Sequence, residues 1–339
     1  MLLLALLWLG LPAMAQPVVV QDHAYTAALR RSSGWTGADG AYSLPVRGGT
    51  LWLFSDTFVG QVAEDGSRLP GWRMVHNSLA LQPGTDPAGM EFWLPPEGHS
   101  WFEPPDGKGW FWLLDGVESE PGRVWVFLSG FESTGAGSFD FTGRGGWLAE
   151  LRVGASGPKV IGYQRVDFGP AVYGAAILAE GDHLFLYGTI DHRDHRELVL
   201  ARSGPDPSRL EEWRFAGPSG WTSRASEARV LLPEVSNEFS VHFENGSYWL
   251  IYESGGRIYR RRSSRPEGPF SAPEMVYQPP EATRQGLFTY NAKAHPELSP
   301  EQGLLVSYNV NTFDNDRHLH EGWLYRPHFI RLVPRWFWP

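Results

Sequence analysis

Acidic side chains at matching places in a repeated sequence pattern could perform acid–base chemistry. Asp39, Asp115 and Glu238 each stand about ten residues before an apolar, aromatic-rich segment, and His295 holds the same place in the last copy of the pattern. Hydrolysis of a glycosidic bond needs one carboxylic acid to protonate the leaving oxygen and a second carboxylate to activate water or to attack the anomeric carbon. Asp39 and Glu238 are the leading pair for this chemistry.

The surroundings of each carboxylate indicate its role. Glu238 opens an apolar strand, where partial desolvation would raise its pKa, so we expect it to be the general acid. Asp39 is expected to be the base, in a turn of small residues that leaves room for a ligand. Asp115 would orient the substrate or keep the pKa of Glu238 high through its like charge. The alternatives are an ion pair of Glu238 with Lys293 or a neighbouring arginine, and a plain Asp-Gly turn at Asp39.

Further polar side chains near these positions could bind sugar hydroxyls. Asp56 ends a strand of the first repeat, where it suits either substrate binding and catalysis or a structural Asx-turn. Glu253 holds the corresponding place in the fourth repeat. The other substrate-binding candidates offer hydrogen-bond donors or ring faces, and they are Tyr173, Asn237, Tyr290, Asn291, Lys293 and His295. Some of these could merely satisfy strand ends.

A five-fold repeat must position these residues. Its first positions follow one another in steps of 76, 59, 64 and 57 residues, and each copy contains a pair of short strands. A period of this size built from strand pairs is typical of β-propellers. We therefore predict an all-β chain, a five-bladed β-propeller with about four antiparallel strands per blade, whose equivalent positions meet at one axis. The blades are expected to begin near residues 39, 115, 174, 238 and 295.

Gly, Pro, Asp and Asn separate short apolar runs along the whole domain. No amphipathic helix is predicted apart from a single turn within residues 207–213. Residues 323–333 read as a strand that completes the last blade or pairs with the first, which would remove open sheet edges. The long segments 60–75 and 83–109 are expected to cover or shape a site.

Several of these segments resemble, in order, the motifs of the DUF4185/DUF5005-like five-bladed propellers. They are Trp35-Thr-Gly-Ala-Asp39-Gly, Leu53-Phe-Ser-Asp56-Thr-Phe, Trp112-Leu-Leu-Asp115-Gly-Val, Tyr173-Gly-Ala-Ala, Ser236-Asn-Glu238-Phe-Ser and Tyr290-Asn-Ala-Lys-Ala-His295-Pro. The resemblance spans about residues 33 to 333. It implies an architecture related to glycoside hydrolases of the arabinanase and invertase-like clans, some of which act on arabinofuranose-containing polysaccharides. A polysaccharide or oligosaccharide is therefore the expected partner.

One departure from this resemblance keeps alternatives open. Gly174 stands where some relatives in the wider clan carry a carboxylate. The first alternative is a non-catalytic propeller that binds carbohydrate or acts in surface interactions. The second is a metal-dependent lactonase or esterase, which the missing ligand set disfavours.

Histidine pairs raise the question of a metal site. His192 and His195 could approach each other in a favourable loop, and His318 and His320 would share one face of a strand. No third ligand is identifiable for either pair from the sequence, so no transition-metal site is predicted and no cofactor is expected. Ca²⁺ near the propeller axis, beside His295, is the one cation that the resemblance leaves open.

Composition limits the classes of partner and of covalent cross-link. The chain has 339 residues, and its formal net charge of −9 argues against nucleic acid as a partner. It has no cysteine, which excludes disulfides. Residues 1–15 are apolar and end in Ala13-Met-Ala15, a signal-peptidase pattern, so we predict a signal peptide and a secreted or periplasmic location. The apolar run is too short to span a membrane. Residues 16–339 are expected to form a single, monomeric domain.

Overall fold

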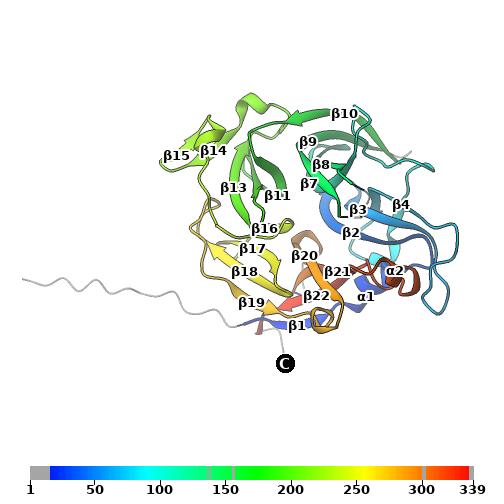
Figure 1. Cartoon of the computed structure of the whole chain (residues 1–339). Helices are drawn as coiled ribbons and strands as arrows, with labels where there is room; N and C mark the ends of the chain where they lie inside the picture. The colour runs from blue at the N-terminus through cyan, green and yellow to red at the C-terminus, as the bar shows by residue number, and fades with distance from the viewer. Residues whose placement is uncertain (1–15, 136, 138, 155–156, 300–302, 336–339) are drawn as a thin grey trace, which may run out of the picture.

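Five antiparallel sheets form a ring in the computed structural model, which describes residues 16–135, 137, 139–154, 157–299 and 303–335. In Figure 1 the strands β2, β7, β11, β16 and β20 lie nearest the centre of the ring, and the other strands of each sheet follow outward. This arrangement confirms the predicted five-bladed β-propeller. The predicted signal peptide, residues 1–15, lies outside the described residues.

The first two blades come from the first half of the chain. Blade one contains β2 (Ser33–Val46), β3 (Gly49–Gln61), β5 (Ser78–Gln82) and β6 (Glu91–Trp93), with β4 (Arg73–Val75) paired to β3. Blade two contains β7 (Trp110–Glu120), β8 (Arg123–Ser133), β9 (Phe141–Gly154) and β10 (Gly157–Val166). Most successive strands are joined by tight turns, so neighbours in sequence pair with one another.

The remaining blades repeat this plan. Blade three contains β11 (Ala171–Glu180), β12 (His183–Asp191), β13 (Arg196–Ser203), β14 (Arg214–Gly217) and β15 (Gly220–Thr222). Blade four contains β16 (Phe239–Glu244), β17 (Ser247–Ser254), β18 (Arg257–Ser263) and β19 (Glu274–Tyr277). Blade five contains β20 (Leu287–His295), β21 (Leu304–Thr312), β22 (Pro327–Val333) and β1 (Val18–Gln21).

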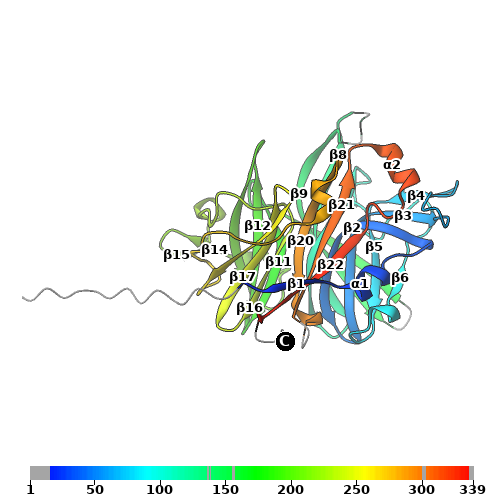
Figure 2. The ribbon, with the colours of Figure 1, turned by 90° about the horizontal axis from the view of Figure 1, so that it is seen from below.

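Blade five joins the two ends of the described chain. β22 pairs with β21 on one side and with β1 on the other, in a register that sets Val18 opposite Val333 and Gln21 opposite Ile330. Figure 2 shows β1 and β22 side by side in the same sheet. Of the two expectations for the terminal segment, completion of the last blade is confirmed. The ring closes because a strand from the N-terminal region is added to the last blade.

Short helices are the elements that the sequence analysis missed. α1 (His23–Ala28) and α2 (Asn315–His320) have six residues each. Asp22 and Asp314 cap them, since each carboxylate accepts a backbone N–H of the first turn. The turn predicted within 207–213 is the 3₁₀ helix η2 (Leu210–Glu212). Among the described residues, no helix is long and apolar enough to cross a membrane.

Large apolar side chains fill the spaces within and between the blades. One cluster joins blades one and two around Leu53, Phe111 and Val126, and another joins blades two and three around Phe127 and Trp213. Trp35, Trp52 and Trp213 are fully buried. Part of the tryptophan content of this sequence therefore packs the wedge-shaped gaps of the propeller.

β-Bulges interrupt four of the five innermost strands. The pairing register shifts around Asp39 in β2, between Leu113 and Gly116 in β7, between Tyr173 and Ala176 in β11, and between Tyr290 and Lys293 in β20. Bulges re-aim side chains and often lie beside active sites. The strand positions of two predicted site residues also differ from expectation. Asp39 lies inside a long strand and not in a turn, and His295 ends the first strand of blade five instead of opening it.

Asp22 links the end of β1 to β22 through its side chain, which gives a test of stability. Its Oδ2 accepts a hydrogen bond from Arg331 Nε in β22 at 2.6 Å, and its Oδ1 accepts the N–H of Tyr25 at 2.9 Å. We expect Asp22→Ala to lower the free energy of unfolding by about 3 kcal/mol, because it leaves the buried Arg331 guanidinium without its carboxylate. Urea denaturation measures the change.

The exposed pair of Arg209 and Glu212 provides the control. Its atoms are 3.2 Å apart, and both side chains are largely in solvent. Glu212→Ala should cost less than about 1 kcal/mol, as surface ion pairs do. Equal losses in the two variants would show that the Asp22 contacts do not hold the ring closed.

Candidate active site

A cavity of about 1020 Å³ opens at the centre of the ring. Residues of all five blades line it, which places it on the propeller axis. Asp39, Asp56, Glu238 and Glu253 face it, so four of the acidic residues that the sequence singled out share one cavity. A concave site with several convergent ionisable groups is the usual form of an active site.

Asp39 is the most perturbed carboxylate of the cavity. Its Oδ2 accepts hydrogen bonds from the hydroxyl of Tyr325 at 3.0 Å and from that of Tyr290 at 3.4 Å. Its Oδ1 is buried and has no hydrogen-bond partner among the described residues. Burial, and then the nearby Asp56 and Glu238 carboxylates, raise the pKa of Asp39 well above its usual range. This environment favours the protonated acid.

Glu238 lies immediately before β16 and forms an ion pair with Lys293 of β20. Both side chains are buried, and Lys293 is only 2% exposed. The ammonium also donates to the carbonyl of Gly40 in β2 and lies 4.1 Å from the ring centroid of Tyr42. Burial raises the pKa of Glu238, and the charge and hydrogen bond of Lys293 oppose that rise. The pKa of Glu238 is raised overall, but the ion pair keeps it lower than burial alone would.

The other two carboxylates have different partners. Asp56 Oδ1 lies 2.9 Å from Nδ1 of His76, whose ring stacks on Trp110 at 4.9 Å. Glu253 in β17 accepts the N–H of Gly256 at 2.6 Å. Burial raises the pKa of Glu253 to about 7, against the backbone hydrogen bonds that lower it. Asp56 is thus tied to a partly exposed histidine, and Glu253 is a carboxyl that titrates near neutrality.

Besides Asp56, three of the expected substrate-binding residues line the cavity. Asn237 is exposed beside Glu238, and Tyr290 donates to Asp39. Asn291 occupies the bulge of β20 with a φ of +59°. This left-handed conformation is uncommon for residues other than glycine and often marks a functional position.

Four other predicted site residues lie outside the lining of this cavity. Asp115 accepts the N–H groups of Gly116 and Ile177, both at 2.8 Å, and burial raises its pKa to about 7. Its carboxylate therefore ties β7 to β11. Tyr173 is buried and packs edge-on against Trp213 at 5.7 Å. The other two are Lys293, which acts through its ion pair, and His295.

His295 belongs to a buried network below the cavity. Its Nδ1 meets Ser43 Oγ at 2.5 Å and its Nε2 meets Ser307 Oγ at 2.8 Å, while Ser43 also donates to Glu297. Burial, followed by the charge of Lys293, lowers the pKa of His295 well below its usual range. Serine hydroxyls thus occupy both ring nitrogens, and this histidine is a neutral structural group at the site where Ca²⁺ was considered.

The pair of His318 and His320 also differs from expectation. Both lie in α2, not in a strand, and residues two apart on a helix point in different directions. His318 is buried against Phe58 and Tyr325, with ring centroids 5.9 and 5.5 Å away. The pair therefore does not present two imidazoles to one ion.

Gly174 has no room for a side chain. Its φ is +101°, and a Cβ atom placed on it would lie 2.3 Å from Cβ of Phe127. No carboxylate can therefore stand at this position in blade three without displacing the core between blades two and three. The inner strand of blade three therefore offers no carboxylate at this position.

The sequence analysis missed an aromatic wall and two polar groups. Phe139, Phe313, Phe288 and Tyr290 form a row with successive ring centroids 5.4, 4.6 and 5.5 Å apart. Phe313 is 72% exposed and Phe139 is 56% exposed, although both are large and apolar. Tyr325, which holds Asp39, and Asn311, which donates to the Tyr290 hydroxyl at 3.3 Å, were also missed. The strand pattern gives no signal for Phe139, Phe313 and Tyr325, because they lie between strands, whereas Asn311 lies near the end of β21.

Comparison with known proteins identifies the family. Residues 22–336 match the family described as domain of unknown function DUF5005. The chain belongs to the DUF5005 family. This confirms the resemblance drawn from the motifs, and no curated protein matches the sequence.

Solved structures support the same fold. A candidate hydrolase from Bacteroides ovatus ATCC 8483 is 22% identical, with a TM-score of 0.78, over 95% of this chain and 92% of that one. CoXyl43, a GH43 β-xylosidase/α-arabinofuranosidase from a compost microbial metagenome, solved with xylotriose, is 12% identical with a TM-score of 0.51, over 92% of this chain and 94% of that one. At these identities the likeness establishes the propeller architecture, and the function must be argued from the site.

Gly174 offers a direct test of the packing between blades two and three. We expect Gly174→Ala to lower the free energy of unfolding by about 3 kcal/mol, because the methyl group combines backbone strain with a clash against Phe127. Gly169 is the control, since its φ is +82° but nothing lies within 4 Å of an added Cβ. Gly169→Ala should cost about 1 kcal/mol, and equal costs in urea denaturation would refute the steric explanation.

Glu253 gives a prediction about pH. Its pKa rises from 4.5 to about 7 on folding, so the folded state holds this proton more tightly than the unfolded chain. The resulting stabilisation is fully present below about pH 4.5 and is lost as the pH rises to about 7. The Gln side chain of the Glu253→Gln variant stays neutral at every pH. As the pH rises through this window, we therefore expect the free energy of unfolding of the variant to increase by about 3 kcal/mol relative to that of the native chain.

Denaturation at about pH 4.5 and pH 8 measures this difference. Glu244→Gln is the control, because Glu244 is exposed at the end of the neighbouring strand β16. If the stabilities of the Glu253→Gln variant and the native chain keep a constant difference between the two pH values, the raised pKa is wrong.

Proposed function

We propose that the protein is a glycoside hydrolase that cleaves a polysaccharide, with Asp39 and Glu238 as its acid–base pair. One observation carries the proposal: two carboxylates with different neighbours, Asp39 beside other carboxylates and Glu238 beside an ammonium, face the same axial cavity. Asp39 is partly buried near other carboxylates, which favours its neutral form, and Glu238 is paired with Lys293, which favours its charged form. Burial raises the pKa of both groups, but the charge of Lys293 opposes that rise at Glu238, whereas neighbouring carboxylates add to it at Asp39. Such a difference in environment is what distinguishes an acid from its base.

In this proposal the roles expected from the sequence are exchanged. Asp39, held by Tyr325 and Tyr290, protonates the leaving glycosidic oxygen. Glu238 remains ionised and either takes a proton from the attacking water or attacks the anomeric carbon itself. After the first step Asp39 is negatively charged, and the two tyrosine hydroxyls that donate to it stabilise that charge. Asp115 contributes by tying blades two and three together.

The walls of the cavity fit a sugar chain. The aromatic row from Phe139 to Tyr290 leads from exposed rings at the rim to the hydroxyl that contacts Asp39. Sugar rings present apolar C–H faces that pack on aromatic rings, while their hydroxyls need polar partners such as Asn237 and Asn311. We propose a polysaccharide substrate of the arabinofuranose-containing class. We also propose that the protein is exported to reach it, with residues 1–15 as the leader, and that it acts as a monomer.

The second candidate is a carbohydrate-binding propeller without catalysis. The observation that favours it is Gly174, because the packing there excludes the blade-three carboxylate that some relatives in the wider clan carry. The same aromatic row would then bind the chain, and Asp39 and Glu238 would accept hydrogen bonds from sugar hydroxyls.

An activity assay tests the proposal. Purified protein is incubated with arabinan, arabinogalactan, fructan and xylan, and released sugars are measured. Asp39→Asn and Glu238→Gln should each lower kcat by about 10²- to 10⁴-fold on the substrate that is cleaved, because each removes one partner of the proton transfer. Glu244→Gln, far from the cavity lining, should keep full activity.

Two outcomes would contradict this assignment. Hydrolysis that survives both substitutions would remove Asp39 and Glu238 from the mechanism. Tight binding of a polysaccharide by the native chain without any released sugar would instead support the binding propeller.

A further inference from the structure

A group of metal-ligating side chains gathers at the rim of the cavity, in the connection between β12 and β13. The strands end and begin at Asp191 and Arg196, which pair with each other, so residues 192–195 form a short loop. The N–H of His192 donates to the carbonyl of His195 at 2.9 Å and closes that loop. The backbone therefore fixes the distance between the two histidines.

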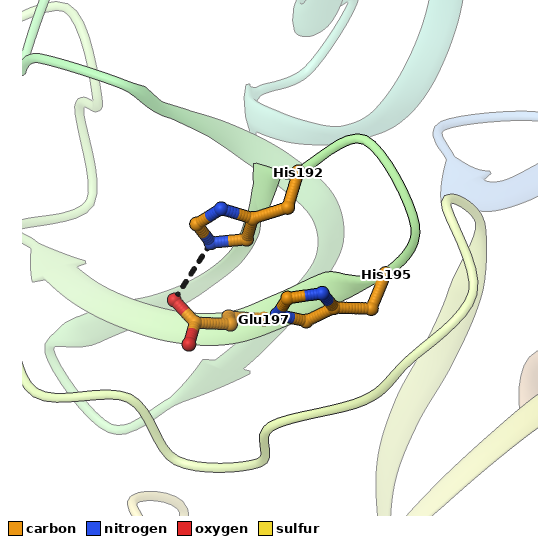
Figure 3. A group of neighbouring side chains, drawn as sticks. All are labelled: His192, His195 and Glu197. Carbon is orange, nitrogen blue, oxygen red and sulfur yellow. Dashed lines mark hydrogen bonds and ion pairs between the residues drawn. The ribbon is translucent and has the colours of Figure 1, made fainter.

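This closed loop brings three donors together. The imidazole rings of His192 and His195 stack with centroids 4.5 Å apart and planes 11° apart. Glu197 follows on β13, and its Oε2 lies 3.1 Å from Nε2 of His192. One donor atom from each of the three residues lies within 4.8 Å of the others, and Figure 3 shows the three side chains gathered on the same side of the loop. The third ligand that the sequence did not reveal is thus Glu197.

The chemistry of these donors selects the type of ion. Two imidazole nitrogens and one carboxylate oxygen suit Zn²⁺ and related transition metals, whereas Ca²⁺ and Mg²⁺ prefer sets of oxygens. Three protein ligands leave one position of a tetrahedral zinc ion open to water or to another molecule. The histidine side chains are open enough for an ion to enter, since His192 is 41% exposed and His195 is 38% exposed at the side chain.

A supporting carboxylate orients one of the ligands. Asp194 Oδ1 lies 2.9 Å from Nδ1 of His195. If Nδ1–H donates to this carboxylate, Nε2 carries the free lone pair and becomes the metal-binding nitrogen. A carboxylate behind a ligating histidine is the usual second partner in zinc sites, where it fixes the ring and makes it more basic.

The location of the group gives the ion a role. Asp194, His195 and Arg196 line the axial cavity, on the side supplied by blade three. We propose that His192, His195 and Glu197 bind a Zn²⁺ ion whose open coordination position faces the mouth of the cavity, where oxygen atoms of a bound molecule can complete its shell. This site is separate from the acid–base pair, and its existence does not depend on the glycosidase assignment.

Zinc binding to the untagged full chain tests the site. Isothermal titration with ZnCl₂ at micromolar protein should show one equivalent bound, and CaCl₂ should not compete. His192→Ala and Glu197→Gln should each abolish stoichiometric binding. Asp194→Asn should weaken it by about 10- to 100-fold, as expected for loss of a supporting carboxylate. Zinc should raise the melting temperature of the native chain and leave that of His192→Ala unchanged.

An exposed His–Glu pair elsewhere provides the matched control. His99 lies 3.2 Å from Glu103, and both are solvent-exposed, but no third donor completes a group with them among the described residues. His99→Ala should bind zinc as the native chain does. Absence of stoichiometric binding to the native chain, or binding that persists in a His192→Ala/His195→Ala double variant, would overturn the proposal.

Discussion

The buried ion pair between Lys293 and Glu238 is the interaction on which the candidate site depends. It joins blade five to the segment that opens blade four, and the same ammonium reaches the Gly40 carbonyl of blade one, next to Asp39. A buried pair is weak evidence for stability, because removing two charges from water costs about as much as their attraction returns. Its position beside the cavity fits the proposed function better. In that proposal it favours the charged form of Glu238 beside a cavity in which neighbouring carboxylates favour the neutral form of Asp39.

The rest of the propeller holds this geometry rigid. The inner strands bring residues from distant parts of the sequence to one axis, and the strand pair β1–β22 closes the ring by backbone hydrogen bonds. Closure matters because the two catalytic candidates come from different blades, so any slippage between blades would change their separation. The bulges at Asp39 and Asn291 then aim individual side chains without breaking the sheets. The sheets therefore fix the positions of the blades, and the bulges set the directions of individual side chains.

The sequence was sufficient for the fold and for part of the site. Repeated strand pairs predicted five blades, and their first positions led to Asp39 and Glu238, which share the cavity. The register failed in blade five, because bulges insert unpaired residues that a count of spacings cannot detect, so His295 was expected where Asn291 and Lys293 lie. Glu197 was missed because it comes close to His192 only when β12 and β13 pair as an antiparallel hairpin. Phe139 and Phe313 lie between strands, where the pattern carries no information.

The central claim is that Asp39 is protonated while Glu238 is ionised in the same cavity. Carboxyl carbons of a ¹³C-labelled chain, titrated by NMR and assigned through Asp39→Asn and Glu238→Gln, measure this directly. At about pH 6, well above the usual pKa of an aspartic acid, the account predicts a neutral Asp39 signal and a charged Glu238 signal. An ionised Asp39 beside a protonated Glu238, or two ionised carboxylates at that pH, would contradict it.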